Sequence, residues 1–549
     1  MTCTTAGKIA MIASLWTFTV ACSGVSSAVN PDGASGNSGS GSSGSGPVTL
    51  ASLSANNTAA CPSSAPLPAH CQTTFTGQID ARPEVATPDF DHPAGNVSTD
   101  DIHAYLTNGT SANIFANFML GFCVQAGSAY CNNNVTTGYN SNDANTVAAQ
   151  VEDLIRRRID GAIVTWEGAG TSEDGATLNF QAYVNAKHCS GPQNCNPRYL
   201  IMYDGPSMAY NVTSTGVTGT SGASCSGKMG TNYENCVIAH IKNDMCYMNG
   251  MHFGNDAYFK VGGRPVVQVF PNESVIPSSG PAPSWADVWK WIGQWNSNLP
   301  QNCVISGGGA QAYNANHGAP LVVFENAGGF SHQDSAGSFY WLQLSGTDPA
   351  SDQFVTNISP ASRGGTLDNF FETAQQFPGE QTWGAGFKGF NSSRAQWGRN
   401  RIMDQACGQT WIQSLTEGNH YYSNAVLPYV QIATWNDYNE GTEIESGIDN
   451  CYAVSGTASG TMLAWRLNPT NSSMASLTTV AHIEIYDSTD GVTATLLTTQ
   501  PAAASGNYSL ASLAQGKHTL YVRMVGKNSI LNRMSAGVSY SNGVVARIR

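Results

Sequence analysis

Short apolar segments of strand length recur through the middle of the chain, and polar or glycine-rich sequence separates them. There are eight of these segments: Ile114–Gly121, Ala162–Gly168, Tyr199–Gly205, Pro265–Phe270, Leu321–Asn326, Phe339–Leu344, Ala385–Phe390 and Tyr429–Asp437. Because they are apolar on both faces, they are typical of parallel strands buried between other layers. The pattern therefore predicts eight parallel strands.

Helical periodicity lies between many of these segments. In Asn142–Arg158 the apolar residues share one face, and Asn142 or Asp143 can cap the first turn. Further helices are expected at Ala286–Asn296, Leu367–Phe377 and Ala395–Leu415. The alternation of eight strands with helices predicts an α/β fold, the (β/α)8 TIM barrel. The alternative is an open doubly wound sheet, which would need a glycine-rich phosphate-binding loop after its first strand, and the sequence shows none there.

The last hundred residues follow a different pattern, in which short β-type segments succeed one another without helical periodicity. The segments are Val454–Leu467, His482–Tyr486, Leu496–Thr499, Tyr508–Leu510, His518–Gly526 and Val538–Val545. Turn sequences separate them, as expected for a small antiparallel β-sandwich of the immunoglobulin-like type. We therefore assign residues 113–451 to the barrel and residues 452–549 to the sandwich.

The N-terminus has the pattern of an export signal. Lys8 precedes Ile9–Ala21, an apolar stretch that is too short to span a bilayer. Two cleavage sites fit: one before Cys22, which would carry a lipid and anchor the protein in a membrane, and one after Ala28. Gly33–Gly46 is almost purely Gly, Ser and Asn, which predicts a flexible tether. We assign residues 1–28 to a signal peptide and residues 29–112 to the tether and an N-terminal extension.

Composition supports export and narrows the range of partners. Charged residues make up 11% of the chain and the formal net charge is −13. Because phosphate binding needs a basic face, this balance argues against a nucleic-acid partner. We expect a monomer that is either a cell-surface lipoprotein or a secreted protein.

The cysteines also favour an oxidising compartment. Of fourteen cysteines, twelve follow the signal region, and four close pairs suggest disulfides: Cys61/Cys71, Cys123/Cys131, Cys189/Cys195 and Cys225/Cys236. The complete pairing does not follow from the sequence. There is no CxxC pair and no His at ligand spacing from a cysteine pair, so a metal site is not expected.

Acidic and large aromatic residues gather at the ends of the expected strands, where the active site of such a barrel lies. They are Trp166, Glu167, Asp204, Glu325, Trp341, Trp435, Asn436, Asp437 and Glu440. Aromatic faces stack on sugar rings, and the cleavage of a glycosidic bond needs two carboxyl groups. Asp437 and Glu440 are three residues apart, so both can face one pocket, and repulsion with partial burial could keep one protonated.

Each of these residues also has a structural explanation. An acid at a strand end often caps the next helix, which is the simpler interpretation for Asp204. Glu167 and Glu325 could pair with a buried Arg or bind sugar hydroxyls without taking part in catalysis. Trp166 and Trp435 could pack at the barrel top.

Several segments resemble glycoside hydrolase family 71, the α-1,3-glucanases or mutanases. The similar segments are Ile114–Gly121, Arg158–Ala162, Gly337–Trp341 and Trp435–Glu440, and the resemblance covers roughly Asn113–Asp449, the span of a whole barrel. Asn117 departs from that family, which often has His there. Glu440-Gly441-Thr442 is more similar to the related family 99 endo-α-mannosidases and mannanases. Both resemblances imply Asp437 and Glu440 as the catalytic carboxyl groups and no metal or organic cofactor, and they leave the stereochemical course open.

The leading hypothesis is an exported glycoside hydrolase that cleaves an α-linked polysaccharide internally, as an endo-α-1,3-glucanase. Asp437 would act as the base or assist the nucleophile, and Glu440 would act as the general acid. Trp166, Glu167, Asp204, Glu325, Trp341, Trp435 and Asn436 would bind the substrate. The alternatives are a family 99-like endo-α-mannanase, a non-catalytic glycan-binding surface lipoprotein built on a decayed barrel, and a structural protein in which the barrel is a spacer.

Overall fold

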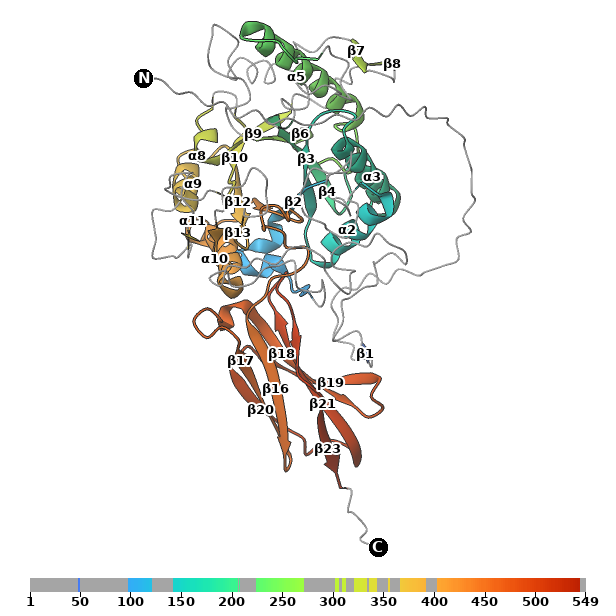
Figure 1. Ribbon diagram of the computed structural model, residues 1–549, viewed down its shortest axis with the longest axis vertical. Coiled ribbons are helices and arrows are strands. Elements are labelled where there is room, and N and C mark those ends of the chain that lie inside the picture. Colours follow the sequence, from blue (N-terminus) through green and yellow to red (C-terminus); the bar gives the residue numbers. More distant parts are fainter. Residues whose placement is uncertain are drawn as a thin grey trace, which may run out of the picture. The chain divides into compact units, whose positions relative to one another are not determined.

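A computed structural model describes residues 48–49, 97–120, 142–205, 207, 224–270, 302–305, 309–312, 320–332, 335–342, 354–355, 366–391 and 402–543 (Figure 1). Several predictions lie outside these residues. They are the signal peptide, the tether, the helix at Ala286–Asn296 and the pairs Cys61/Cys71 and Cys123/Cys131.

The core of the protein is a closed barrel of eight parallel strands. They are β2 (Asn113–Phe118), β3 (Gly161–Trp166), β4 (Arg198–Asp204), β6 (Arg264–Phe270), β9 (Leu321–Glu325), β10 (Gly337–Phe339), β12 (Gln381–Gly386) and β15 (Tyr429–Ile432). Their order around the barrel is β4-β3-β2-β15-β12-β10-β9-β6, and the parallel pairing of β6 with β4 closes the ring. The short strand β5 (Lys260–Val261) pairs with β6 in an antiparallel hairpin. The predicted (β/α)8 barrel is confirmed by this pairing.

Helices lie outside the ring of strands (Figure 1). They are α2 (Ala144–Arg156), α3 (Ser172–Lys187), α5 (Thr231–Met251), α8 (Asn326–Gly329), α9 (Thr366–Ala374), α10 (Gln409–Thr416) and α11 (Gly418–Tyr421). Asp143 caps α2, because its carboxylate accepts hydrogen bonds from the backbone N–H groups of Asn145 and Thr146. The amphipathic helices α2 and α9 were predicted, whereas α3 and α5 were not.

The predicted helix at Ala395–Leu415 is wrong over part of its length. Ile402–Met403 forms strand β14, and Ala406–Gly408 forms a 3-10 turn in which Cys407 has a positive φ of 54°. Within residues 402–415, the part of this segment that the structure describes, the α-helix begins at Gln409. The left-handed backbone of Gly408, with φ of 83°, separates the turn from α10. The strands β10 and β12 also begin earlier than predicted.

Aromatic rings close the end of the barrel at which the strands begin. The rings of Trp383 and Tyr429 stack with centroids 4.6 Å apart, and Phe115 lies 4.8 Å from Phe259. The guanidinium of Arg198 lies over the Phe259 ring. Because the strand beginnings are filled in this way, polar groups inside the barrel concentrate towards the strand ends.

The C-terminal part is a β-sandwich of two antiparallel sheets. One contains β16 (Tyr452–Ser459), β17 (Met462–Pro469) and β20 (Ser505–Ser509); the other contains β18 (Val480–Ser488), β19 (Thr493–Pro501), β21 (Gly516–Gly526), β22 (Arg533–Met534), β23 (Val538–Asn542) and β1 (Val48–Thr49). The segment Val454–Leu467, predicted as one strand, is a hairpin. Gly460, with φ of 57°, lies in its turn. Alternate residues such as Leu463, Trp465 and Ile485 fill the space between the sheets.

Residues of the sandwich hydrogen-bond residues near the end of α2 and the start of α10. The Asn528 side chain donates hydrogen bonds to the carbonyl groups of Arg157 and Asp100, and the Trp411 indole donates to the Asn528 carbonyl. Arg157 lies between α2 and the start of β3. The disulfide Cys407–Cys451 links the turn before α10 to the residue that precedes β16.

Disulfides among the described residues support export. Cys189–Cys195 and Cys225–Cys236 are bonded, as their spacing predicted, in addition to Cys407–Cys451. Such bonds persist in oxidising compartments, which is typical of extracellular proteins. No helix within the described residues has the length and apolar character needed to cross a membrane.

Candidate functional site

The direction of each strand-end side chain follows from the alternation of a β-strand between two faces. In β4, Met202 points into the barrel, where its sulfur contacts Asn117, and Tyr203 points outward to a helix. Asp204, at the end of β4, therefore points inward. By the same alternation Glu325 at the end of β9 and Glu167 after β3 also point inward. Three of the predicted acids thus lie on one rim of the barrel.

Trp341 completes this rim. It comes directly after Tyr340, the residue that follows β10, and the Tyr340 side chain points outward and hydrogen-bonds Thr366 of α9. The Trp341 ring therefore points inward, where its centroid lies 5.0 Å from that of Phe270 at the end of β6. The ring is half-buried, so part of its surface is available to a ligand. We call Glu167, Asp204, Glu325 and Trp341 the inward rim.

Two of the predicted aromatic residues have a packing role instead. Trp166 points outward, is fully buried, and donates its indole N–H to Asp174 of α3 at 3.0 Å. Trp435 is also fully buried, with the Arg157 guanidinium 4.8 Å from its ring centroid. Neither ring presents a face to solvent, so in this structure neither can stack on a sugar.

Asp437 and Glu440 lie in a tight loop that follows β15. The backbone N–H of Thr434 donates to the Thr442 carbonyl, and the hydroxyl groups of these residues are 2.8 Å apart, which closes the loop at its base. Within the loop, Oδ1 of Asp437 accepts the backbone N–H groups of Asn439 and Glu440, each at 3.1 Å. Asp437 is buried and Glu440 is half-buried. The loop therefore holds both predicted acids at the strand ends.

This loop is fixed to its two neighbours in the barrel. On the β2 side, the Asn436 amide forms two hydrogen bonds with the backbone of Met119. On the β12 side, the Asn391 N–H donates to the Glu440 carbonyl at 2.6 Å. There, too, Lys388 Nζ lies 3.0 Å from a carboxylate oxygen of Glu443, and both side chains are fully buried. The amide of Asn436, predicted to bind substrate, is thus engaged with the backbone.

Burial changes the acidity of the carboxyl groups in this region. It raises the pKa of Asp437 to about 6, although the two backbone N–H groups oppose the shift. Burial also raises the pKa of Asp204, against hydrogen bonds from the Ser207 backbone and hydroxyl. A fraction of Asp437 is therefore protonated close to neutral pH, which suits a group that exchanges protons.

A polar layer beneath the inward rim was not anticipated. Asn117, Thr165, Gln268 and Gln431 lie inside the barrel and are buried. Thr165 donates to the Asn117 amide oxygen, whereas the amide atoms of Gln268 and Gln431 have no hydrogen-bond partner among the described residues. This layer could have been predicted from the sequence, because each of these polar residues interrupts an otherwise apolar strand segment. These two amides have hydrogen-bonding capacity to spare for a ligand that reaches the interior.

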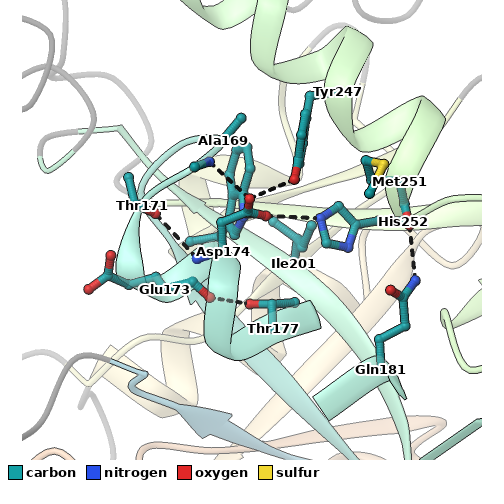
Figure 2. Close-up of polar contacts among 12 residues, drawn as sticks. Ala169, Thr171, Glu173, Asp174, Thr177, Gln181, Ile201, Tyr247, Met251 and His252 are labelled. Atoms are coloured by element: carbon teal, nitrogen blue, oxygen red, sulfur yellow. Dashed lines mark hydrogen bonds and ion pairs between the residues drawn. The ribbon is translucent and has the colours of Figure 1, made fainter. Parts of the chain in front are cut away.

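A second polar cluster, behind β3 and β4, was also missed (Figure 2). Asp174 of α3 points toward Tyr247 and His252 at the end of α5, and accepts their hydrogen bonds at 2.7 and 3.3 Å. Asp244, also on α5, accepts the Tyr203 hydroxyl at 2.7 Å. Although burial opposes it, the partners of Asp174 lower its pKa, whereas burial raises the pKa of Asp244 to about 7.

One group of side chains has the composition of a metal site. The sulfur atoms of Cys225 and Cys236 and a ring nitrogen of His240 lie within 4.8 Å of one another. The two sulfurs are joined in a disulfide. Because a metal binds thiolate and not disulfide sulfur, this group does not fit a metal ion in its oxidised form.

No family model matches the chain, and no curated protein matches it either. Among solved structures, the GH99 endo-α-mannosidase of Bacteroides thetaiotaomicron in complex with bis-tris-propane aligns with 12% identity and a TM-score of 0.37, over 61% of this chain and 86% of that one. A second structure of that enzyme gives 11% identity and a TM-score of 0.37 over 61% and 87%. A glycoside hydrolase-like protein gives 10% and 0.35 over the same shares. Likeness at this level decides neither fold nor chemistry, and the barrel is established by its own strand pairing.

Proposed function

We propose that the protein is an exported glycoside hydrolase that cleaves an α-linked polysaccharide within the chain. The observation that carries this proposal is the arrangement at the strand ends. A loop fixed on both sides presents Asp437 and Glu440 at the end of the barrel that bears the inward rim. Paired carboxyl groups with further hydrogen-bonding groups are what glycoside cleavage requires.

We assign the role of base, or of assistant to the nucleophile, to Asp437. A carboxylate whose conjugate acid has a pKa of about 6 takes up a proton more readily than an ordinary carboxylate. Its hydrogen bonds to two backbone N–H groups fix its orientation. We assign protonation of the leaving oxygen to Glu440, which is the less buried of the two.

The rim residues would bind the sugar rings beside the scissile bond. Carboxylates of Glu167, Asp204 and Glu325 can accept hydrogen bonds from sugar hydroxyls, and the half-buried Trp341 can stack on a ring face. Trp166, Trp435 and Asn436 support this surface from behind. The proposal therefore separates the nine predicted residues into six that face the substrate or its site and three that hold them.

An α-1,3-glucan is the first candidate substrate, because Trp435-Asn436-Asp437-Tyr438-Asn439-Glu440 resembles the corresponding segment of family 71. An α-mannan is the alternative, because Glu440-Gly441-Thr442 is similar to family 99. A panel of both polymer classes, with product analysis, distinguishes the two.

The experiment compares hydrolysis by the wild-type protein, Asp437→Asn and Glu440→Gln, each without residues 1–46. We expect oligosaccharides from one polymer, and a loss of at least roughly 100-fold in both variants, since each removes a proton-transfer group. If the wild type binds a polymer without cleaving it, and both variants bind equally well, the protein is instead a non-catalytic glycan-binding protein on a decayed barrel.

The route of export is a separate proposal with two alternatives. If Cys22 is lipidated, the mature N-terminus is an acylated cysteine and the protein is a cell-surface lipoprotein. Cleavage after Ala28 would give an unmodified N-terminus and a secreted protein. Mass spectrometry of the mature N-terminal peptide distinguishes them.

A further inference from the structure

We propose that Asp174 and Asp244 are positioning residues that hold Glu167 in the candidate site by fixing the chain on both sides of it. The inference rests on the proposed function, because it treats Glu167 as a residue that contacts substrate. Neither carboxylate faces the barrel interior, so both would act through Glu167 rather than on the substrate. We call these two residues the carboxylate clamp.

Asp174 fixes the residue before Glu167 and the backbone after it. Its Oδ1 accepts the indole N–H of Trp166 at 3.0 Å, and its Oδ2 accepts the Gly170 N–H at 2.9 Å. Tyr247 and His252 donate further hydrogen bonds from α5 to the same carboxylate (Figure 2). Asp174 is buried, so these bonds are shielded from water.

Asp244 holds the same loop from the second helix. Its Oδ1 accepts the Ala169 N–H at 3.3 Å, and its Oδ2 accepts the Tyr203 hydroxyl at 2.7 Å. Gly168 has a φ of 125°, and a side chain there would meet the Asp244 carboxylate at 3.7 Å. The backbone between Glu167 and Thr171 thus passes directly over Asp244.

Together the two carboxylates restrain the chain from Trp166 to Gly170, and Glu167 is the residue in this stretch that points into the barrel. Stability alone does not explain two buried carboxylates, because apolar side chains of similar volume often stabilise a core equally well or better. A clamp of this kind is useful where one side chain must be held to a fraction of an ångström.

The geometry also predicts a dependence on pH. Tyr203 of β4 donates its hydroxyl to Asp244, and the charge of Asp174 on α3 also acts on Asp244. Asp204 acts on Tyr203, and Tyr247 and His252 hydrogen-bond Asp174, so these groups affect Asp244 only through its neighbours. Burial raises the pKa of Asp244 to about 7. Below that pH the protonated carboxyl can no longer accept both hydrogen bonds with full strength, so the hold on the loop weakens.

The test is a double-mutant cycle measured by kcat/KM on the polymer that the wild type cleaves. We expect Asp174→Asn and Asp244→Asn each to lower kcat/KM roughly tenfold or more, because a displaced polar group loses its contribution. In a Glu167→Gln background the same changes should have less than about a twofold effect, because the residue on which they act is already lost. The kcat/KM of the wild type should fall as the pH drops through about 7, because Asp244 becomes protonated. The Asp244→Asn variant should not show this part of the decline.

Thr177→Val is the matched control. Thr177 lies one turn beyond Asp174 on α3, is equally buried, and donates its hydroxyl to the Glu173 carbonyl without contact with the loop (Figure 2). It should leave kcat/KM within about twofold of wild type. Circular dichroism and the melting temperature of every variant show whether the fold is retained, and Tyr203→Phe loosens Asp244 without removing a charge if Asp244→Asn does not fold.

The proposal is wrong if Asp174→Asn and Asp244→Asn lower kcat/KM by the same factor in the Glu167→Gln background as in the wild type. It is also wrong if Glu167→Gln alone keeps the kcat/KM of the wild type. Failure of the proposed function is a different result, in which Asp437→Asn and Glu440→Gln keep full activity. If the wild type binds a polymer without cleaving it, the dissociation constant of that polymer replaces kcat/KM in the cycle. The same fold changes then support or overturn the proposal.

Discussion

The side chain of Asn436 and the backbone of Met119 form a closed pair of hydrogen bonds. The Met119 N–H donates to Oδ1 of Asn436, and Nδ2 of Asn436 donates to the Met119 carbonyl, each at 2.8 Å. The bridge joins the end of β2 to the loop that carries Asp437. Because it needs a donor and an acceptor on one planar group, only an amide side chain of this length fits it.

Asn436→Asp should therefore impair both stability and activity. The variant keeps the acceptor but turns a carboxylate oxygen toward the Met119 carbonyl, which should cost about 1–3 kcal/mol. Asn113→Asp is the control, because Asn113 donates to the Pro428 carbonyl at the opposite end of β2 and β15. Chemical denaturation and kcat/KM should show that Asn436→Asp loses both stability and activity. Asn113→Asp should keep its activity, because its carboxylate lies at the other end of the barrel and still accepts the Arg198 guanidinium. Equal activity of the two would mean that the bridge does not hold the catalytic loop.

Removal of one partner of the Lys388–Glu443 pair should be more damaging than removal of both. Lys388→Met leaves the Glu443 carboxylate buried without its cation and should cost about 3–5 kcal/mol, whereas Lys388→Met with Glu443→Leu should recover most of that loss. Arg533→Met serves as the comparison, because it breaks the partly exposed pair with Asp449 and should cost no more than about 1 kcal/mol. A double variant as unstable as the single one would contradict this expectation.

Asp437→Asn should stabilise the protein at alkaline pH. The folded-state pKa of Asp437, about 6, is above its ordinary value of 3.8, so between these values the folded state holds more protons than the unfolded state. The stability that this group contributes is present below pH 3.8 and is lost as the pH rises through 6. The variant should exceed the wild type at pH 8 by at most about 3 kcal/mol, and the difference should vanish near pH 4. Denaturation midpoints at both pH values test this, and a difference that does not change with pH would refute it.

The two tryptophans at strand ends should respond differently to substitution. Trp341→Ala should raise KM for the polymer with a small change in stability, because its half-buried ring lies on the inward rim. Trp166→Phe should instead lower the melting temperature, because it removes the N–H that Asp174 accepts. Initial rates over a range of polymer concentrations, with melting curves, separate the two effects. An unchanged KM in Trp341→Ala would exclude it from the binding surface.

Much of the fold could be predicted because each buried parallel strand corresponds to a short, continuous apolar segment of the sequence. The segment Leu321–Asn326 matches β9 closely, since its first four side chains are all apolar. The helices α3 and α5 have no comparably clear apolar pattern. Asp174 on α3 and Asp244 on α5 are polar residues on the buried faces, so the apolar stripe by which a helix is recognised is interrupted.

The candidate site could be located at the strand ends from the sequence, but not resolved residue by residue. Trp166 and Glu167 are adjacent, and an alternating strand cannot turn both of them inward. Which one faces the barrel depends on the register of β3 against β4, a property that a single sequence does not display. The engagement of Asn436 with Met119 depends likewise on a contact between residues 317 positions apart.

The disulfide between Cys407 and Cys451 makes a covalent ring of the chain between them. The two cysteines are 44 positions apart, and the ring contains α10, β15, Asp437 and Glu440. A protease that cuts the ring once outside the cell produces no separate fragment, because both ends remain tied to the rest of the molecule. The chain-entropy estimate for a ring of this size is about 4 kcal/mol of stabilisation. The part of the chain that bears the two proposed catalytic acids is thus the part that a single cut cannot detach.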